Sequence, residues 1–355
     1  MTAWAFVVGI DQYPPDSKLR TLRGAVADAA AFADWVADPQ GGAVAPENLY
    51  FWTCPAPTAP QSAVDLAKKP TPWPLTIVDF TRPPTTQDIC RGIFMVAVNA
   101  RNAGATRLYV FLAGHGFQTM QLGYEEPPQN CFVAGNFDPR VAADGLVPCD
   151  DMARMLKVAG PPEIVIFIDA CREDARLSVA RPAPPWNRLA DPGHNQVLCV
   201  GRAAQERMVA YEVPHGNPSR GAFSMLLVNA LSGHRVGGRL TARDLEDFIG
   251  GAIGALVAPL EQYPDIDERP RPRKLVLAQG ERSVALPDVV IQIVAQPNEG
   301  LMLIGGERNA RIPISNQIGT TRIQLEPGAY ILETASGAQV CAFAHFGPGA
   351  THVQI

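Results

Sequence analysis

One histidine and one cysteine each follow a predicted strand and could together form a nucleophilic pair. His115 lies between two glycines after the apolar run 107–113, and Cys171 follows the run 163–169 after one alanine. In open α/β sheets, reactive side chains emerge just past the carboxyl ends of the strands. A thiol becomes a nucleophile once ionised, and a neighbouring imidazole can take its proton and later protonate a leaving amine. The two residues are therefore candidates for base and nucleophile in acyl transfer.

Gly116 could place a backbone donor beside this pair. A glycine lets its N–H approach a developing oxyanion closely, and with the N–H of Cys171 it would supply the two donors that acyl transfer needs. Taken singly, a cysteine after a buried strand is usually a small core residue, and a histidine at a Gly-rich turn is usually structural. Their joint occurrence at two strand ends, 56 residues apart, favours chemistry at His115 and Cys171.

Composition excludes several other classes of protein. The 355 residues suffice for about two domains, and 47 % hydrophobic residues exclude wholesale disorder. A net charge of −5 disfavours nonspecific nucleic-acid binding. The seven cysteines contain no Cys-x-x-Cys pair, which argues against a disulfide framework or a zinc finger and fits a reducing cytoplasm. No apolar run is long enough for a membrane span, and the acid at position 11 disfavours a signal peptide.

Apolar runs alternate with amphipathic stretches from residue 3 to about 278. The predicted strands are 5–9, 76–80 within a Pro-rich insertion, 107–113, 163–169, 197–201 and an edge strand at 274–277. The predicted helices are 24–37, 86–100 with Thr86 as its cap, 151–159, 222–231 and 241–257. This alternation predicts an α/β fold with a mostly parallel sheet covered by helices on both faces.

The pattern changes after about residue 284, where helical periodicity ends. Short strands separated by Gly, Pro and Asn are predicted at 289–294, 301–304, 321–325 and 330–333. We therefore expect two domains, one over 1–280 and a small all-β, sandwich-like domain over 286–355.

Four regions resemble the caspase clan of cysteine peptidases. They are the opening Ala5–Tyr13 with Leu22–Ala29, similar to the start of bacterial caspase-like domains and metacaspases; Val110–Gly116, like their histidine strand; Ile166–Arg172, like their nucleophile strand; and Gly221–Leu231, like a helix of the smaller-subunit region. The resemblance covers about 1–278. It implies a caspase-hemoglobinase fold and a cysteine endopeptidase of proteins or peptides without a cofactor, with His115 as general base and Cys171 as nucleophile.

Asp28 and Asp169 carry what the resemblance implies about specificity. Animal caspases have Gln where this chain has Asp169, whereas metacaspases have acids that match both positions and resemble the floor of the S1 pocket. Two carboxylates would attract a cationic P1 side chain, which implies cleavage after Arg or Lys. From the residues alone, Asp28 could also be a solvated acid in a first helical turn, and Asp169 a cap at a strand end. Ala113 replaces the metacaspase Ser, and Glu173 the caspase Gly, which puts fine specificity in doubt.

The loop 174–195 is rich in Pro and Arg, and exposed segments of this kind are easily cut. It is either an intersubunit linker that the enzyme itself cleaves, at Arg176 or Arg188, or an inert surface loop.

Five acids could form a calcium site of the kind that some metacaspases use: Glu125, Glu126, Asp150, Asp151 and Asp174. A simpler reading takes Asp150 as the N-cap of the following helix. No other set of metal ligands is expected.

Gln324–Tyr330 looks like part of a PEGA-like or transthyretin-like sandwich domain. Modules of this type usually bind or present other molecules rather than catalyse. The domain over 286–355 is therefore expected to recruit a protein partner or to regulate access to the peptidase domain. Two alternatives to a peptidase stay open: a caspase-like binding or scaffolding protein that no longer cleaves, and a different hydrolase that uses Cys171.

Overall fold

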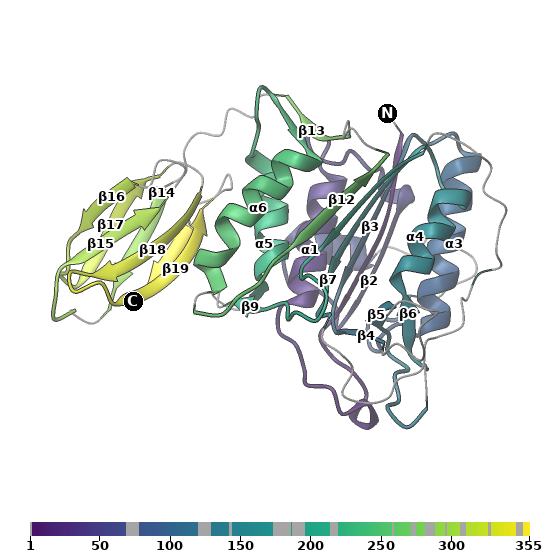
Figure 1. The fold of residues 1–355 in the computed structure, drawn as a ribbon, viewed down its shortest axis with the longest axis horizontal. Coiled ribbons are helices and arrows are strands. Elements are labelled where there is room, and N and C mark those ends of the chain that lie inside the picture. Colours follow the sequence, from purple (N-terminus) through teal and green to yellow (C-terminus); the bar gives the residue numbers. More distant parts are fainter. Residues whose placement is uncertain are drawn as a thin grey trace. The chain divides into compact units, whose positions relative to one another are not determined.

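The chain folds into two compact units in a computed structural model (Figure 1). The model describes residues 2–68, 78–119, 129–141, 144–172, 186, 196–213, 219–257, 259–270, 275–280, 288–294, 297–305, 310–325, 328–345 and 351–355. One unit comprises Met1–Met225 with Gln262–Leu275, and the other Leu226–Glu261 with Val276–Ile355. The expected domain limits, 280 and 286, enclose residues 281–285, which lie outside the described part of the chain. The second unit also takes in residues 226–261 and 276–280, which the sequence analysis assigned to the first domain.

A six-stranded sheet forms the centre of the first unit. Its strands are, in spatial order, β12 (Asp265–Arg269), β8 (Val197–Arg202), β7 (Glu163–Asp169), β3 (Arg107–Ala113), β1 (Ala3–Ile10) and β2 (Leu49–Cys54). All neighbours are parallel except β12, which is antiparallel to β8. The three central strands are almost continuously apolar, as strands buried on both faces must be. The predicted α/β fold with a mostly parallel sheet is confirmed.

Helices cover both faces of this sheet, α1 on one side and α3 with α4 on the other. The helices are α1 (Ala25–Ala37), α2 (Gln61–Lys68), α3 (Thr86–Asn102), α4 (Cys149–Ala159), α5 (Ala222–Gly233) and α6 (Ala242–Val257), with 3-10 helices η1 (Pro15–Ser17) and η2 (Pro46–Asn48). The cap of α3 is Thr85 rather than Thr86. The Thr85 hydroxyl accepts the N–H of Asp88 at 3.2 Å, and the Asp88 carboxylate accepts the N–H of Thr85 at 2.9 Å, which completes a capping box.

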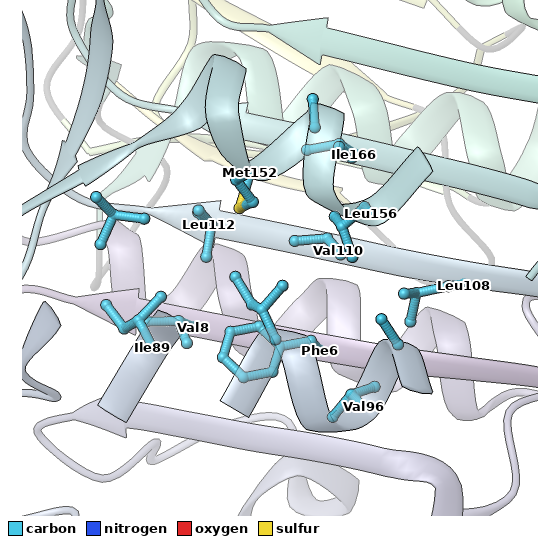
Figure 2. Packing of buried hydrophobic residues seen from close by; sticks show 14 of the residues in the cluster. Phe6, Val8, Ile89, Val96, Leu108, Val110, Leu112, Met152, Leu156 and Ile166 are labelled. Atoms are coloured by element: carbon cyan, nitrogen blue, oxygen red, sulfur yellow. The ribbon is translucent and has the colours of Figure 1, made fainter. Parts of the chain in front are cut away.

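A large core lies between the sheet and the pair α3 and α4 (Figure 2). Because side chains alternate along a strand, every second residue of the central strands points into it. Its members include Phe6, Val8, Ile89, Val96, Leu108, Val110, Leu112, Met152, Leu156 and Ile166. This layer fixes the relative positions of β1, β3 and β7 and therefore of the loops at their carboxyl ends.

The opposite face brings α1 against the same strands through aromatic rings. Phe32 stacks on Phe111 with ring centroids 4.5 Å apart and meets Phe167 edge-on at 6.0 Å. Asp28 lies one helical turn before Phe32, and Asp169 lies two residues after Phe167 on the same face of β7. The helical and strand repeats therefore bring these two carboxylates together.

The sequence prediction placed the edge strand wrongly. The expected strand at 274–277 is displaced to β13 (Val276–Gln279), which pairs with β11 (Arg239–Thr241) instead of joining the large sheet. The edge of the large sheet is β12, whose sequence Asp-Ile-Asp-Glu-Arg is mostly charged, as edge strands often are. Within the expected strand 76–80, residues 78–80 are not a strand, and 76–77 lie outside the described residues.

Three further regular segments were not predicted in the first unit. They are the helix α2, the strand β2 and the hairpins that lie next to the large sheet. These hairpins are β4 (Gly116–Gln118), β5 (Asn130–Val133) and β6 (Leu146–Pro148) in one sheet, and β9 (Glu212–Val213) with β10 (Arg220–Gly221) in another.

The second unit contains a β-sandwich, as expected for the C-terminal region. Its strands are β14 (Asp288–Ile293), β15 (Leu301–Gly305), β16 (Ala310–Ile314), β17 (Gly319–Gln324), β18 (Gly328–Thr334), β19 (Gln339–His345) and β20 (Thr351–Gln354). They form a three-stranded sheet, β17-β14-β20, and a four-stranded sheet, β16-β15-β18-β19, with one shared core. The helix α6 packs against β18 and β19. In the described parts of both units, no helix combines the length and the apolar character of a membrane span.

Candidate active site

A cleft at the carboxyl ends of β3 and β7 brings together four of the five predicted site residues, all except Gly116. It is open to solvent and is lined among others by Asp28, His115, Asp169 and Cys171. Because β3 and β7 are adjacent, with Ala113 paired to Asp169, their last residues deliver the histidine and the cysteine to the same edge. The cleft lies entirely within the first unit.

The orientation of the His115 ring is fixed by a backbone carbonyl. Its Nε2 lies 2.7 Å from the carbonyl oxygen of Arg20. A carbonyl only accepts hydrogen bonds, so Nε2 carries the proton and the lone pair is on Nδ1. Burial lowers the pKa of His115, which keeps the ring neutral near pH 7. A neutral imidazole with a free lone pair is the form that a general base requires.

Tyr13 supports the segment that carries this histidine. The Tyr13 hydroxyl accepts the backbone N–H of His115 at 3.0 Å and donates to the carbonyl of Val133 at 3.2 Å. Its ring lies 5.1 Å from the His115 ring, tilted by 57°. Burial raises the pKa of Tyr13, so the hydroxyl stays protonated and keeps its donor.

Gly116 lies directly against the backbone of Cys171. A Cβ on Gly116 would be 2.5 Å from the Cys171 carbonyl oxygen, so no larger residue fits. Gly116 pairs with Phe132, and the N–H of Val133 donates to the carbonyl of His115 at 2.9 Å beside that pair. This pattern makes Gly116 a non-hydrogen-bonded position of the antiparallel ladder, so its N–H points away from β5. The Cys171 side chain is half-buried, with Sγ 3.6 Å from the carbonyl of Ala210.

Two buried carboxylates form one end of the cleft. Asp28 is 1 % exposed, so it is not a solvated acid of the helix surface. Burial raises its pKa to about 6, although the Arg220 guanidinium and the N–H of Gly221 lower it. Asp169 accepts the hydroxyl of Ser224 at 2.5 Å and its N–H at 3.1 Å. Burial, with the nearby charge of Asp28, raises the pKa of Asp169 to about 7.

Gly221 makes this approach of the two acids possible. A Cβ there would lie 2.2 Å from Oδ2 of Asp169 and 2.8 Å from Oδ2 of Asp28. Both carboxylates therefore contact the same glycine, one from β7 and one from α1.

We expect Gly221→Ala to destabilise the protein and to weaken any activity that depends on the two acids. The added methyl group would force the carboxylates apart, at a cost of about 1–3 kcal/mol, typical of overpacking. Urea unfolding measures this loss. Gly250→Ala is the matched control, since a Cβ at Gly250 in α6 meets nothing within 4 Å and should leave stability unchanged or slightly raised. Equal effects of the two changes would contradict the packing argument.

Several site residues were missed by the sequence analysis. Glu212 of β9 accepts the N–H groups of Arg23 at 2.8 Å and Gly24 at 2.6 Å, and so caps the start of α1 from outside the helix. Arg20 holds the histidine through its backbone, for which no side-chain pattern exists. Ser224 lies within the motif that resembles the smaller-subunit helix, so this motif is the signal that could have found it.

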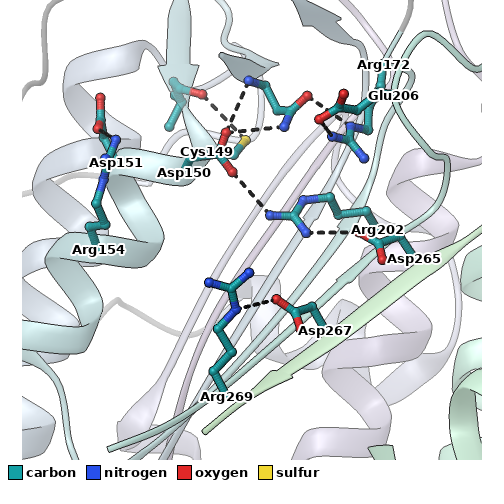
Figure 3. Close-up of polar contacts among 12 residues, drawn as sticks. Cys149, Asp150, Asp151, Arg154, Arg172, Arg202, Glu206, Asp265, Asp267 and Arg269 are labelled. Carbon is teal, nitrogen blue, oxygen red and sulfur yellow. Dashed lines mark hydrogen bonds and ion pairs between the residues drawn. The ribbon is translucent and has the colours of Figure 1, made fainter. Parts of the chain in front are cut away.

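The acids suggested for calcium are engaged in ion pairs where the structure describes them (Figure 3). Asp150 pairs with Arg202 at 3.2 Å, and Asp151 pairs with Arg154. Asp150 is not the N-cap of α4: the helix begins at Cys149, and Pro148 occupies the cap position. The other three acids (Glu125, Glu126 and Asp174) lie outside the described residues. Within the part of the chain that is described, no three His, Cys, Asp or Glu side chains are grouped to hold a metal ion.

The loop 174–195 lies outside the described residues except for Trp186. The indole N–H of Trp186 donates to the carbonyl of Cys90 in α3 at 3.2 Å.

Comparisons with known proteins place the chain in a family. The model of the caspase domain (peptidase C14) matches residues 2–249. Solved structures with a similar fold include one of a Geobacter sulfurreducens protein, at 15 % identity over 79 % of this chain and 100 % of the other, with a TM-score of 0.47. Caspase-1 from Spodoptera frugiperda is 14 % identical over 80 % of this chain and 92 % of its own, with a TM-score of 0.46. No curated protein sequence gives a match. Because the family model covers more than half of its length, this chain belongs to the caspase-domain family of cysteine peptidases.

Proposed function

We propose that this protein is an endopeptidase that cleaves polypeptides after Arg or Lys, with His115 and Cys171 as its catalytic pair. The observation that carries the proposal is the composition of one cleft, which is lined by that pair together with the buried acids Asp28 and Asp169. The family supplies the reaction class, and the charge of the cleft supplies the substrate preference.

The first chemical step forms an acyl-enzyme. Nδ1 of His115 takes the thiol proton of Cys171, and Sγ attacks the carbonyl carbon of the P1 residue. The carbonyl electrons move to oxygen, and the resulting oxyanion accepts the N–H groups of Gly116 and Cys171. When the tetrahedral species collapses, the C–N bond breaks and the imidazolium donates its proton to the leaving amine.

The second step hydrolyses the thioester. His115 takes a proton from water, the hydroxide attacks the acyl carbon, and the C–S bond breaks. The P1 carboxylate leaves and the protonated imidazole returns its proton to the thiolate. The hydrogen bond from Nε2 to the Arg20 carbonyl stabilises the imidazolium that forms in both steps, because a protonated ring is a stronger donor.

Charge at the far end of the cleft sets the P1 preference. A buried carboxylate is stabilised by a cation that replaces the water it has lost, and an arginine can offer two parallel N–H donors. Asp169 supports this role because Ser224, a neutral residue, is its hydrogen-bond partner, so its negative charge is still available to a substrate. An acidic P1 side chain would be repelled there.

A positional tetrapeptide library with Arg, Lys, citrulline, Leu or Asp at P1 tests the proposal. We expect cleavage after Arg and Lys and little after citrulline, the neutral isostere of Arg. Preference for Asp or Leu would overturn the specificity. Absence of all peptide cleavage, together with no labelling of Cys171 by an arginine chloromethyl ketone, would support a scaffolding protein instead. Labelling without peptide cleavage would favour another hydrolase.

Four expectations from the sequence stay predictions. Running the library with and without Ca²⁺ tests the calcium requirement, and mass spectrometry of the enzyme during turnover tests cleavage within 174–195. Recruitment of a protein partner by the region 286–355 and a cytoplasmic location need separate experiments.

A further inference from the structure

Arg220 is a cation held against one of the two buried acids of the cleft. Its Nε forms an ion pair with Asp28, and the neighbouring Gly221 donates its N–H to the other oxygen of the same carboxylate at 2.7 Å. The side chains are 16 % and 1 % exposed, so water screens this pair weakly. Both oxygens of Asp28 therefore have a partner within the chain.

Arg220 reaches Asp28 from outside the cleft. Asp28 and Gly221 line the cleft, whereas Arg220, among the described residues, lines a neighbouring and mostly apolar cavity that also includes Asp11. Because Arg220 does not line the cleft, a substrate bound there need not displace it from Asp28. The pair can thus persist while a substrate is bound.

Asp169 has different partners. Its Oδ2 accepts both hydrogen bonds of Ser224, and the described part of the chain contains no ion pair to Asp169. In the ionised state, the charge of Asp28 is cancelled by Arg220, while that of Asp169 is not. The two acids are equivalent in the sequence motif but not in the electrostatics of the pocket.

We propose that Arg220 is a specificity-determining residue: it cancels the charge of Asp28 and leaves Asp169 as the carboxylate that recognises the P1 cation. This inference rests on the proposed preference for Arg and Lys and refines it. Of the two buried acids, one then keeps an unbalanced negative charge for one positive side chain, which is the matched condition for selectivity. Glu212 also lines the cleft, but one of its oxygens accepts the N–H groups of Arg23 and Gly24. Asp28 is a positioning residue that holds the guanidinium of Arg220 away from the substrate.

A double-mutant cycle tests this assignment. The full chain with Cys171→Ala binds without cleaving, so calorimetry can compare a tetrapeptide amide that ends in Arg with its citrulline analogue. At pH 8, above the pKa of about 7 for Asp169, we expect Asp28→Asn to weaken binding of the Arg peptide about tenfold, because Arg220 then repels it. Arg220→Gln should strengthen it several-fold, and the double variant should bind within about threefold of the parent.

The double variant decides between the two acids. It carries a neutral pair of similar shape, so it avoids the folding risk of either single change. Binding as weak as that of Asp28→Asn would show that Asp28 itself contacts the substrate and would overturn the proposal. Equal losses for Arg and citrulline peptides in Arg220→Gln would show a purely structural role and would also overturn it. Arg220→Lys, which keeps the cation, should bind like the parent.

The same binding data distinguish failure of the proposed preference for Arg and Lys from failure of the role of Arg220. If the parent binds Arg and citrulline peptides equally, the preference for a cationic P1 residue is wrong, and the assignment of Arg220 fails with it. If the parent prefers Arg but the double variant does not, only the assignment of Arg220 fails.

Discussion

Replacing Cys171 by alanine is expected to abolish peptide cleavage and to leave the fold intact. No other thiol lines the cleft, so without Sγ the acyl-enzyme cannot form there. Loss of a nucleophile that works with a base lowers kcat by roughly 10⁴- to 10⁶-fold. The side chain is half-buried, and one sulfur atom is removed, so the free energy of unfolding should change by less than about 1.5 kcal/mol. Stopped-flow or endpoint assays with an Arg-P1 peptide, beside urea unfolding, measure both quantities.

Cys341→Ala is the matched control for this experiment. Cys341 is a free thiol of the second unit and is not among the residues that line the cleft, so its removal should leave turnover unchanged. Cleavage retained within tenfold by Cys171→Ala would remove Cys171 from the role of nucleophile. Labelling by an arginine chloromethyl ketone is an independent readout: it should be lost in Cys171→Ala and kept in Cys341→Ala.

Asp169→Asn is expected to remove most of the preference for a cationic P1 residue. The amide keeps the shape of the side chain, and its oxygen can still accept from Ser224, but it carries no charge. Truncating the charge of a buried pair typically costs 2–5 kcal/mol, so kcat/KM for Arg substrates should fall by about 100-fold. Cleavage of the citrulline analogue should stay within a few-fold of the wild type. An equal fall for both substrates would contradict a role in charge recognition.

The same residue should give the reaction a pH dependence that is specific to cationic substrates. Because the pKa of Asp169 is raised to about 7, the carboxyl is largely protonated at pH 6 and ionised at pH 8. A substrate cation needs the ionised form, so kcat/KM for Arg peptides should rise between pH 6 and 8, mainly through KM. Asp28 and Asp11, each with a pKa raised to about 6, contribute at the lower end of this range, whereas the pKa of His115 is lowered.

Citrulline peptides separate the pH dependence due to Asp169 from the pH dependence of the catalytic pair. They should show only the ionisation of the catalytic pair, and Asp169→Asn should show the same simple profile with Arg peptides.

The free energy of unfolding should change with pH in the opposite direction to kcat/KM for Arg peptides. The folded-state pKa of Asp169 lies above its ordinary value of 3.8, so its contribution to stability is complete below about pH 4 and is lost as pH rises through 7. Asp169→Asn should therefore gain stability relative to the wild type between pH 4 and pH 8.

The sequence predicted the strands that carry the chemistry because their patterns are strong. The runs 107–113 and 163–169 coincide with β3 and β7, since strands buried on both faces must be apolar throughout. The charged strand β12 was missed because an edge strand needs few apolar side chains. The strand β2 does carry a strand signal in its aromatic run Tyr50, Phe51 and Trp52, because aromatic residues are enriched in strands.

The candidate site was predicted at its strand ends and missed where distant loops contribute. His115, Cys171, Asp28 and Asp169 follow from motifs, and the cleft contains all four. The carbonyl of Arg20 carries no side-chain signal, because any residue offers the same oxygen. The ion pair of Asp28 with Arg220 joins residues 192 apart, and pairings at such separation depend on the tertiary fold.

The bond from Gly221 to Asp28, which spans 193 residues, has a consequence for synthesis on the ribosome. The proposed S1 floor needs a helix made near the beginning of translation and a glycine that emerges only after His115 and Cys171, the proposed catalytic pair. A nascent chain with both reactive groups already outside the exit tunnel therefore still lacks a complete specificity pocket.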